Sequence, residues 1–207
     1  MNPSDGYALA PLPPAILDAE QPRRLLVAGV DLAFAHDGCA LVVLEHTADA
    51  VRVIDHDFRV PAPGAPFDPV EIAEQYMQRL DALGCRVVVA DVHYVEVVRR
   101  AAREHGITLV HAPSGDARTR AFILLRHYTR ARTIRFPRIV AEHLRKIQLV
   151  VRPGGGVGIQ APRTDGAGHA DLAFALVAAV AIDARMHGLV GDAQATVRTH
   201  RGAWSAP

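Results

Sequence analysis

The feature that most constrains this chain is a short apolar run at residues 23–31 (RRLLVAGVD), which is uncharged from Leu25 to Val30 and ends on Asp31. A continuous run of this length, rich in Leu and Val, is typical of a strand that is buried on both faces. An unpaired buried carboxylate is costly, so Asp31 needs a cation or a hydrogen-bond donor beside it. The run therefore predicts a central strand that ends at a functional site.

Two later segments repeat this arrangement. Residues 86–91 (RVVVAD) form a second apolar run that ends on Asp91, and Asp171 opens the long apolar stretch 171–186. Each Asp alone also fits a structural role, because Asp forms turns at strand ends and caps helix N-termini. Their joint occurrence favours one site in which three carboxylates bind hard divalent cations such as Mg²⁺ or Mn²⁺.

The spacing of apolar residues predicts an α/β fold with a mixed five-stranded sheet and helices on both faces. The first three strands form an antiparallel meander, and the strand-helix-strand unit that follows implies parallel pairing. Strands are expected at residues 23–31, 39–44, 51–58, 86–91 and 107–110. Helices are expected at residues 70–83, 94–105, 116–128, 138–148 and 171–186.

The remaining segments predict an extra hairpin and irregular ends. Residues 149–152 and 157–160 flank a Pro-Gly-Gly-Gly turn, and residues 133–136 are a short extended piece. The glycines are not a phosphate loop, because such a loop needs Lys followed by Ser or Thr, whereas Lys146 is followed by Ile147. We expect an N-terminal arm (1–22), one α/β domain (23–188) and a flexible tail (189–207).

Composition narrows the class of protein. With 207 residues, half of them hydrophobic, the chain suits one domain with a sizeable core. It shows no signal-peptide pattern, and its longest apolar run, 172–182, is about half of a membrane span. We expect a soluble, intracellular protein. Cys39 and Cys85 fall in predicted strands without metal-like spacing, so we expect reduced core residues.

The net charge of +1 hides an asymmetry along the chain. Residues 1–98 carry a net charge of −9, whereas residues 99–163 carry +11. Few acidic residues are interleaved with the basic ones, which favours a polyanion-binding face over solvated helix surfaces. The residues that we expect to contact a nucleic-acid backbone are Arg118, Arg120, Arg132, Arg135, Arg145 and Lys146.

The order of these motifs resembles the nuclease domain of viral (bacteriophage) large terminase subunits, which belongs to the ribonuclease H-like superfamily. The resemblance covers roughly residues 25–187. It rests on the two Asp-ending strands, the glycine hairpin and the segments 133–137 (TIRFP), 144–147 (LRKI) and 169–173 (HADLA).

The resemblance implies a ribonuclease H-like fold and a metal-dependent DNA endonuclease that holds two Mg²⁺ or Mn²⁺ ions. Asp31, Asp91 and Asp171 would be the metal-binding catalytic carboxylates. Many family members have two acids in the last motif, and Ala170 occupies the first of those places here. His169 matches the histidine of that motif and would either lie beside the metal ligands or order the loop by a hydrogen bond. Asp37 and His93 are close in sequence to Asp31 and Asp91, so they too are expected around the metal ligands.

The resemblance also implies a biological setting. The substrate would be double-stranded DNA, cut from viral concatemers during genome packaging in the cytoplasm of a bacterial host, with no membrane involved. The partners would be a separate packaging ATPase, a small terminase subunit or a portal. Full-length large terminases carry an N-terminal packaging ATPase that this sequence lacks, so it would be either part of a split or truncated terminase or a separate nuclease subunit.

Two other functions fit the same residues. A resolvase-type nuclease of the same fold would cut branched DNA and would prefer junctions. A catalytically silent DNA-binding or capsid-docking module would keep the fold, and metal would neither bind it tightly nor change its thermal stability.

Overall fold

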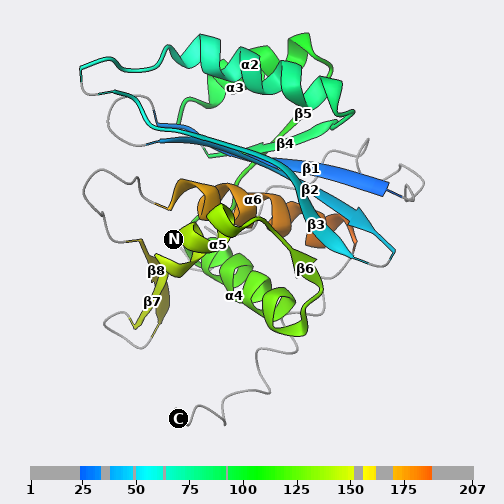
Figure 1. The fold of residues 1–207 in the computed structure, drawn as a ribbon, viewed down its shortest axis with the longest axis vertical. Coiled ribbons are helices and arrows are strands. Elements are labelled where there is room, and N and C mark those ends of the chain that lie inside the picture. Colours follow the sequence, from blue (N-terminus) through cyan, green and yellow to red (C-terminus); the bar gives the residue numbers. More distant parts are fainter. Residues whose placement is uncertain are drawn as a thin grey trace, which may run out of the picture.

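The computed structural model describes residues 24–33, 38–48, 50–62, 64–91, 93–151, 156–161 and 170–187. Its centre is a six-stranded mixed sheet in the order β5-β4-β1-β2-β3-β6 (Figure 1). The strands are β1 (Arg24–Asp31), β2 (Cys39–Thr47), β3 (Val51–Arg59), β4 (Val87–Ala90), β5 (Thr108–His111) and β6 (Ile134–Arg135). The first three strands pair as the antiparallel meander that the sequence predicts.

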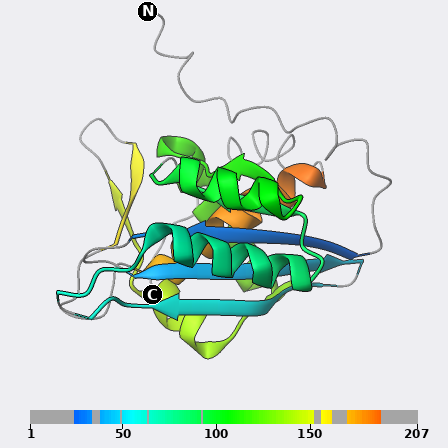
Figure 2. The ribbon, with the colours of Figure 1, turned by 90° about the horizontal axis from the view of Figure 1, so that it is seen from above.

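Helices cover both faces of the sheet. One face carries α2 (Pro69–Ala82) and α3 (Val95–Glu104), and Figure 2 shows α2 lying over the sheet. The other face carries α4 (Gly115–Ala131), α5 (Arg138–Arg145) and α6 (Asp171–Met186). A separate antiparallel hairpin is formed by β7 (Gln148–Val151) and β8 (Val157–Gln160).

The sheet has one strand more than the predicted five. The extended piece around residue 134 pairs in parallel with the start of β3, with Val51 opposite Ile134 and Arg52 opposite Arg135. A strand of two residues is too short to show the alternation that identifies a strand in a sequence. Similarly, α5 ends before the predicted residue 148, because Gln148 pairs with Gln160 in the hairpin.

Other expectations have clear outcomes. Helix α6 has the predicted bounds, and α4 continues past residue 128 until Arg132 takes a left-handed conformation with φ 57°. Cys39 and Cys85 are free and buried, as expected. In the described part of the chain, no helix is long and apolar enough to cross a membrane. The expected N-terminal arm and C-terminal tail lie outside the described residues.

The alternation of side chains along β1 divides the core into two layers. Val27 packs in the cluster that contains α6, whereas Ala28 and Val30 pack in the cluster that contains α2 and α3. Asp31 has the same parity as Val27, so its side chain belongs to the α6 face. The two buried clusters thus also fix which face of the sheet receives the carboxylate.

Helix α6 lies directly against β1 at Gly29. A Cβ atom built on Gly29 would overlap the carbonyl of Ala175 and would lie 3.1 Å from the amide nitrogen of Ala179. Helix and strand therefore approach each other backbone to backbone, which only a residue without a side chain permits. This contact sets the height of the whole helix above the sheet.

We expect Gly29→Ala to lower the free energy of unfolding by about 3 kcal/mol, because the added methyl group must push α6 away from β1. Urea denaturation followed by circular dichroism measures this change. The matched control is Gly156→Ala, since a Cβ there would meet no atom within 4 Å. Equal transition midpoints for the two variants would contradict the close packing at Gly29.

Candidate functional site

The register of the sheet places Asp31 and Asp91 at the same edge. Strands β1 and β4 run parallel, with Val30 opposite Ala90. Asp31 is the last residue of β1, and Asp91 directly follows β4, so the two residues come next in this register. Both belong to the face of the sheet that α6 covers, because Val27 and Val89, which have the same parity, pack in the α6 cluster.

Asp171 reaches this edge from the helix above it. It is the first residue of α6 and is 3% exposed. It follows Ala170, which turns the chain into the helix with a φ of 69°. Ala175, one helical turn further on, is the residue that contacts Gly29, two positions before Asp31. The contact between α6 and β1 therefore brings Asp171 over the end of β1.

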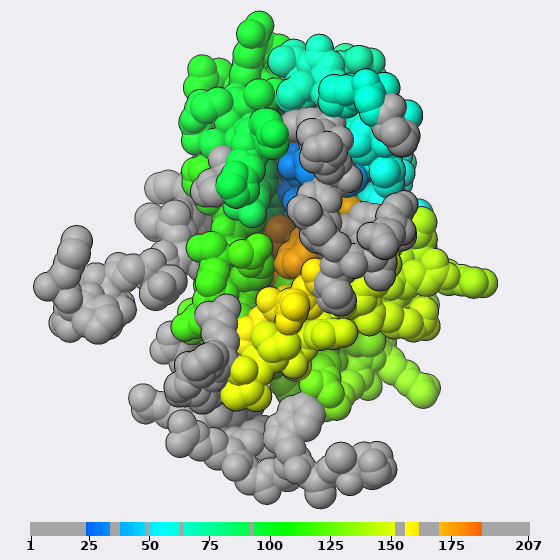
Figure 3. All heavy atoms as spheres, turned by 90° about the vertical axis from the view of Figure 1, so that its left-hand side faces the viewer, coloured from blue at the N-terminus to red at the C-terminus, as the bar shows by residue number. Residues whose placement is uncertain are grey.

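The three aspartates line one cleft of about 180 Å³. Figure 3 views the molecule from this end, where blue atoms of the β1 region lie between the green and the cyan segments, and orange atoms of the α6 region lie below them, above the yellow segment. The other lining residues are Val30, Ala33, Ala112, Pro113, Arg118, Phe174, Val177 and Ala178. Three residues that are 60 and 80 positions apart in sequence thus share one hollow.

Backbone at Gly38 lies close beside the carboxylate of Asp171. A Cβ atom on Gly38 would lie 3.0 Å from Oδ2 of Asp171 and 2.9 Å from the carbonyl oxygen of Arg59. The thiol of the neighbouring Cys39 has a pKa raised to about 11. Burial is the main cause, and the negative charges of Asp31 and Asp171 add to it. Gly38 therefore lies where a side chain would overlap the ring of Phe58 and crowd Oδ2 of Asp171.

Arg118 contributes positive charge to the same cleft. It lies in the first turns of α4, is half-buried, and places its guanidinium carbon 5.7 Å from the ring centroid of Phe174. Phe174 also lines the cleft and is one turn along α6 from Asp171. The aromatic ring thus supports a cation beside the three aspartates.

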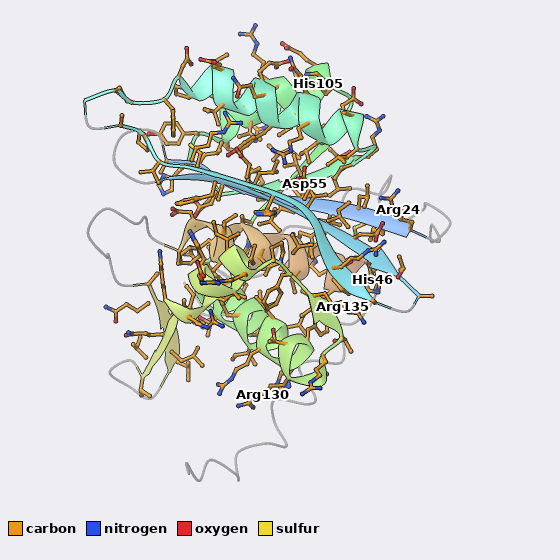
Figure 4. All side chains as sticks on the ribbon, in the orientation of Figure 1. Arg24, His46, Asp55, His105, Arg130 and Arg135 are labelled. Atoms are coloured by element: carbon orange, nitrogen blue, oxygen red, sulfur yellow. The ribbon has the colours of Figure 1, made fainter. Side chains whose placement is uncertain are left out.

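The other basic residues of the predicted set are spread over the molecule. Arg120 is exposed on α4, and Arg145 and Lys146 lie at the end of α5. Arg132 follows the last residue of α4, about 21 Å along the helix from Arg118. Arg135 lies in β6 beside the start of β3, whereas the cleft lies at the far end of that strand (Figure 4). Of the six residues, Arg118 lines the cleft.

The residues expected around the metal ligands have different outcomes. His93 is exposed in the turn before α3 and does not line the cleft. Asp37 and His169 lie outside the described residues.

A histidine that the sequence did not single out supports the start of α6. His143 of α5 is 4% exposed, and its Nδ1 lies 3.4 Å from the backbone nitrogen of Leu172, from which it accepts a hydrogen bond. Burial, reinforced by the charge of Lys146, lowers the pKa of His143 to about 4, so the ring is neutral at pH 7. The only sequence signal is that His143 follows buried Val140 by three positions, on one face of a helix.

The chain matches a family model as well as solved structures. The model of the terminase RNaseH-like domain matches residues 28–182, a segment that contains the three aspartates and Arg118. No curated protein matches the chain.

The large terminase of bacteriophage HK97 has a TM-score of 0.63 and 17% identity, over 78% of this chain and 40% of that one. The large terminase nuclease from thermophilic phage G20c has a TM-score of 0.60 and 17% identity, over 77% of this chain and 82% of that one. The same nuclease with bound magnesium has a TM-score of 0.55 and 19% identity, with the same shares. At these identities the likeness establishes the ribonuclease H-like fold that the sequence predicts.

The segment that the family model matches includes the helices as well as the strands of the sheet. It begins inside β1 and ends near the C-terminus of α6, so it includes every strand and helix that contributes to the cleft. The chain therefore belongs to the family of terminase RNase H-like domains.

Proposed function

We propose that the chain is a divalent-metal-dependent DNA endonuclease in which Asp31, Asp91 and Asp171 hold the metal. The observation that carries this proposal is the convergence of the three carboxylates, from two strand ends and one helix start, in a single cleft. The magnesium-bound form of the G20c large terminase nuclease supports a divalent ion in a domain of the same fold.

The residues of the cleft fit such ions. Three carboxylates supply the oxygen ligands that Mg²⁺ and Mn²⁺ prefer, and their combined negative charge is what two divalent cations would compensate. A Cβ atom at Gly38 would lie 3.0 Å from Oδ2 of Asp171, so the glycine keeps a side chain from crowding this ligand oxygen. When bound, ions of this kind activate a water molecule and stabilise the leaving oxygen of a phosphodiester.

The chain's own residues would prepare the substrate. Without cations the three carboxylates repel a phosphate, so DNA approaches the cleft only where positive charge offsets that repulsion. Arg118 supplies one such charge at a fixed place, because Phe174 supports its guanidinium. A guanidinium donates two hydrogen bonds to one phosphate, which orients the backbone without reading its sequence.

We further propose double-stranded DNA as the substrate and phage genome packaging as the process. The chain spans 40% of the length of the HK97 large terminase. A packaging ATPase, a small terminase subunit or a portal would act together with the nuclease domain. Membership of the terminase family supports this setting.

The first test replaces each carboxylate of the cleft. We expect Asp31→Asn, Asp91→Asn and Asp171→Asn each to lower cleavage of supercoiled plasmid with Mn²⁺ or Mg²⁺ by at least about 100-fold, because each loses a charged ligand. Asp81→Asn is the control, since Asp81 is exposed and pairs with Arg86 at the end of α2. Cleavage that persists in excess chelator, or full activity in any cleft variant, would contradict the proposal.

The second test compares two basic residues at opposite ends of the molecule. Arg118→Gln should weaken binding to duplex DNA of any sequence and make its dependence on salt shallower by about one unit, as one phosphate contact is lost. Arg135→Gln should change both quantities much less, because Arg135 lies far from the cleft. Fluorescence anisotropy over a salt series measures both. Equal losses in the two variants would instead favour a DNA track over the whole basic segment.

The third test concerns His143 as a positioning residue for Asp171. His143→Ala should raise the Mn²⁺ concentration needed for half-maximal cleavage, because Leu172 loses the acceptor that orients the first turn of α6. His143→Gln should recover part of the effect, since its amide oxygen can accept the same hydrogen bond. An unchanged Mn²⁺ dependence in His143→Ala would show that the contact does not orient Asp171.

The same residue makes stability depend on pH. The folded pKa of His143, about 4, lies below the ordinary value of 6.5, so the unfolded chain binds the proton first. Its contribution to stability is complete above about pH 6.5 and is lost as the pH falls towards the folded pKa. Calorimetry should therefore show a larger drop in Tm between about pH 7.5 and about pH 5 for the wild type than for His143→Gln.

A further inference from the structure

A second cluster of ionisable groups lies at the opposite end of α6 from the cleft. It consists of His46 on β2, Asp183 in the last turns of α6, and His187 directly after the helix. Asp183 is twelve residues after Asp171, which corresponds to about 18 Å along the helix. Figure 4 shows His46 on the same side of the molecule as Arg135, at the end of the sheet away from the cleft.

Both imidazoles face one buried carboxylate. Nδ1 of His46 lies 2.9 Å and 3.0 Å from the two carboxylate oxygens of Asp183. Nδ1 of His187 lies 3.5 Å from Oδ1 of Asp183 and 2.9 Å from its backbone carbonyl oxygen. The two rings stack with their centroids 3.7 Å apart, and one ligand atom from each of the three residues lies within 4.8 Å of the others.

These separations suit a small ion. A tetrahedral ion with bonds of about 2.0–2.1 Å holds its ligand atoms about 3.3 Å apart. The distances from Oδ1 of Asp183 to the two Nδ1 atoms, 2.9 Å and 3.5 Å, lie on either side of that value. For both nitrogen lone pairs to point at one ion, the two stacked rings, whose planes now differ by 22°, must tilt away from each other. His187 then exchanges its hydrogen bond to the backbone carbonyl of Asp183 for the ion.

The surroundings favour a positive charge at this point. Asp183 is 1% exposed, and its burial raises its pKa against the opposing effect of His46. Burial, and then the charge of Asp183, raise the pKa of Tyr128 to about 12. The buried hydroxyl of Tyr128 has no hydrogen-bond partner among the described residues.

We propose that His46, Asp183 and His187 bind one divalent transition-metal ion of the zinc class, which clamps the end of α6 to β2. Two imidazoles and one carboxylate, with water in a fourth position, form a donor set that suits Zn²⁺ and Co²⁺. Mg²⁺ prefers oxygen ligands and does not compete well at such a site. The ion takes the place of the hydrogen that each Nδ1 directs towards Asp183, and each neutral imidazole then carries its hydrogen on Nε2. This site is separate from the cleft in both place and chemistry.

The experiment uses the full chain with the cleft disabled by Asp31→Asn and Asp171→Asn together. Co²⁺ and Zn²⁺ are the probes, because Co²⁺ reports nitrogen ligation by visible absorption. We expect one ion per chain and a rise in Tm of about 5 °C when the ion is in large excess over its dissociation constant, with no rise in Mg²⁺. Absence of Co²⁺ and Zn²⁺ binding in this variant would overturn the proposal.

Histidine variants made in the same background locate the ion. The double variant His46→Gln, His187→Gln should abolish binding of the ion. The side chain of His187 is 23% exposed and can be replaced without disturbing the core, so His187→Gln alone should weaken binding at least about tenfold. His127→Gln is the control, because His127 is an exposed histidine on α4. Undiminished binding in His187→Gln would also overturn the proposal. Because the binding assay uses a disabled cleft, its outcome is independent of whether the wild type cleaves DNA.

Discussion

The structure depends first on the contact between α6 and β1 at Gly29. Backbone meets backbone there, at Ala175 and Ala179, and α6 carries four further buried alanines, at positions 173, 178, 181 and 184. Because these side chains are small, α6, which is buried along most of its length, can pack at a short distance from the sheet. It thereby excludes water from the central strands. The same low position brings the first carboxylate of the helix to the edge where two strands end.

The acidic and basic residues are separated along the sequence, but the fold brings residues of both kinds to the cleft. The acidic first half of the chain forms the meander and β4, and so delivers Asp31 and Asp91 from buried strands. The basic segment forms α4 and α5, which pack beside α6 on one face of the sheet. Among the basic side chains of this segment that the structure describes, Arg118 lines the cleft, whereas Arg120, Arg132 and Arg135 do not. Net charge along a sequence thus indicates a partner class but not the path that the partner follows.

The parts of the fold that the sequence predicts are those with local signals. Apolar runs ending on Asp31 and Asp91 predict the strands and their shared edge, and the long apolar run after Asp171 predicts α6 with its bounds. Features that depend on distant partners left no such signal. The sequence predicts that residues 133–136 are extended, but it does not predict the pairing of β6 with Val51, and His46 lies 137 positions from Asp183. In the sequence, His143 is one residue of an amphipathic helix. Its role depends on its hydrogen bond with Leu172 at the start of α6, which only the structure shows.

The contact with Gly29 lies nearer to the N-terminal end of α6 than to its C-terminal end, so a tilt of the helix about this contact moves its two ends by different amounts. The fulcrum, at Ala175, is four residues from Asp171 and eight residues from Asp183, or about 6 Å and about 12 Å along the axis. A small tilt about this point moves the two ends in opposite directions, and the end at Asp183 moves about twice as far as the end at Asp171. Movement of the C-terminal end is therefore halved and reversed by the time it reaches the carboxylate in the cleft. Any tilt of α6 about the Gly29 contact therefore displaces Asp171 less than Asp183, because Asp171 lies closer to the contact.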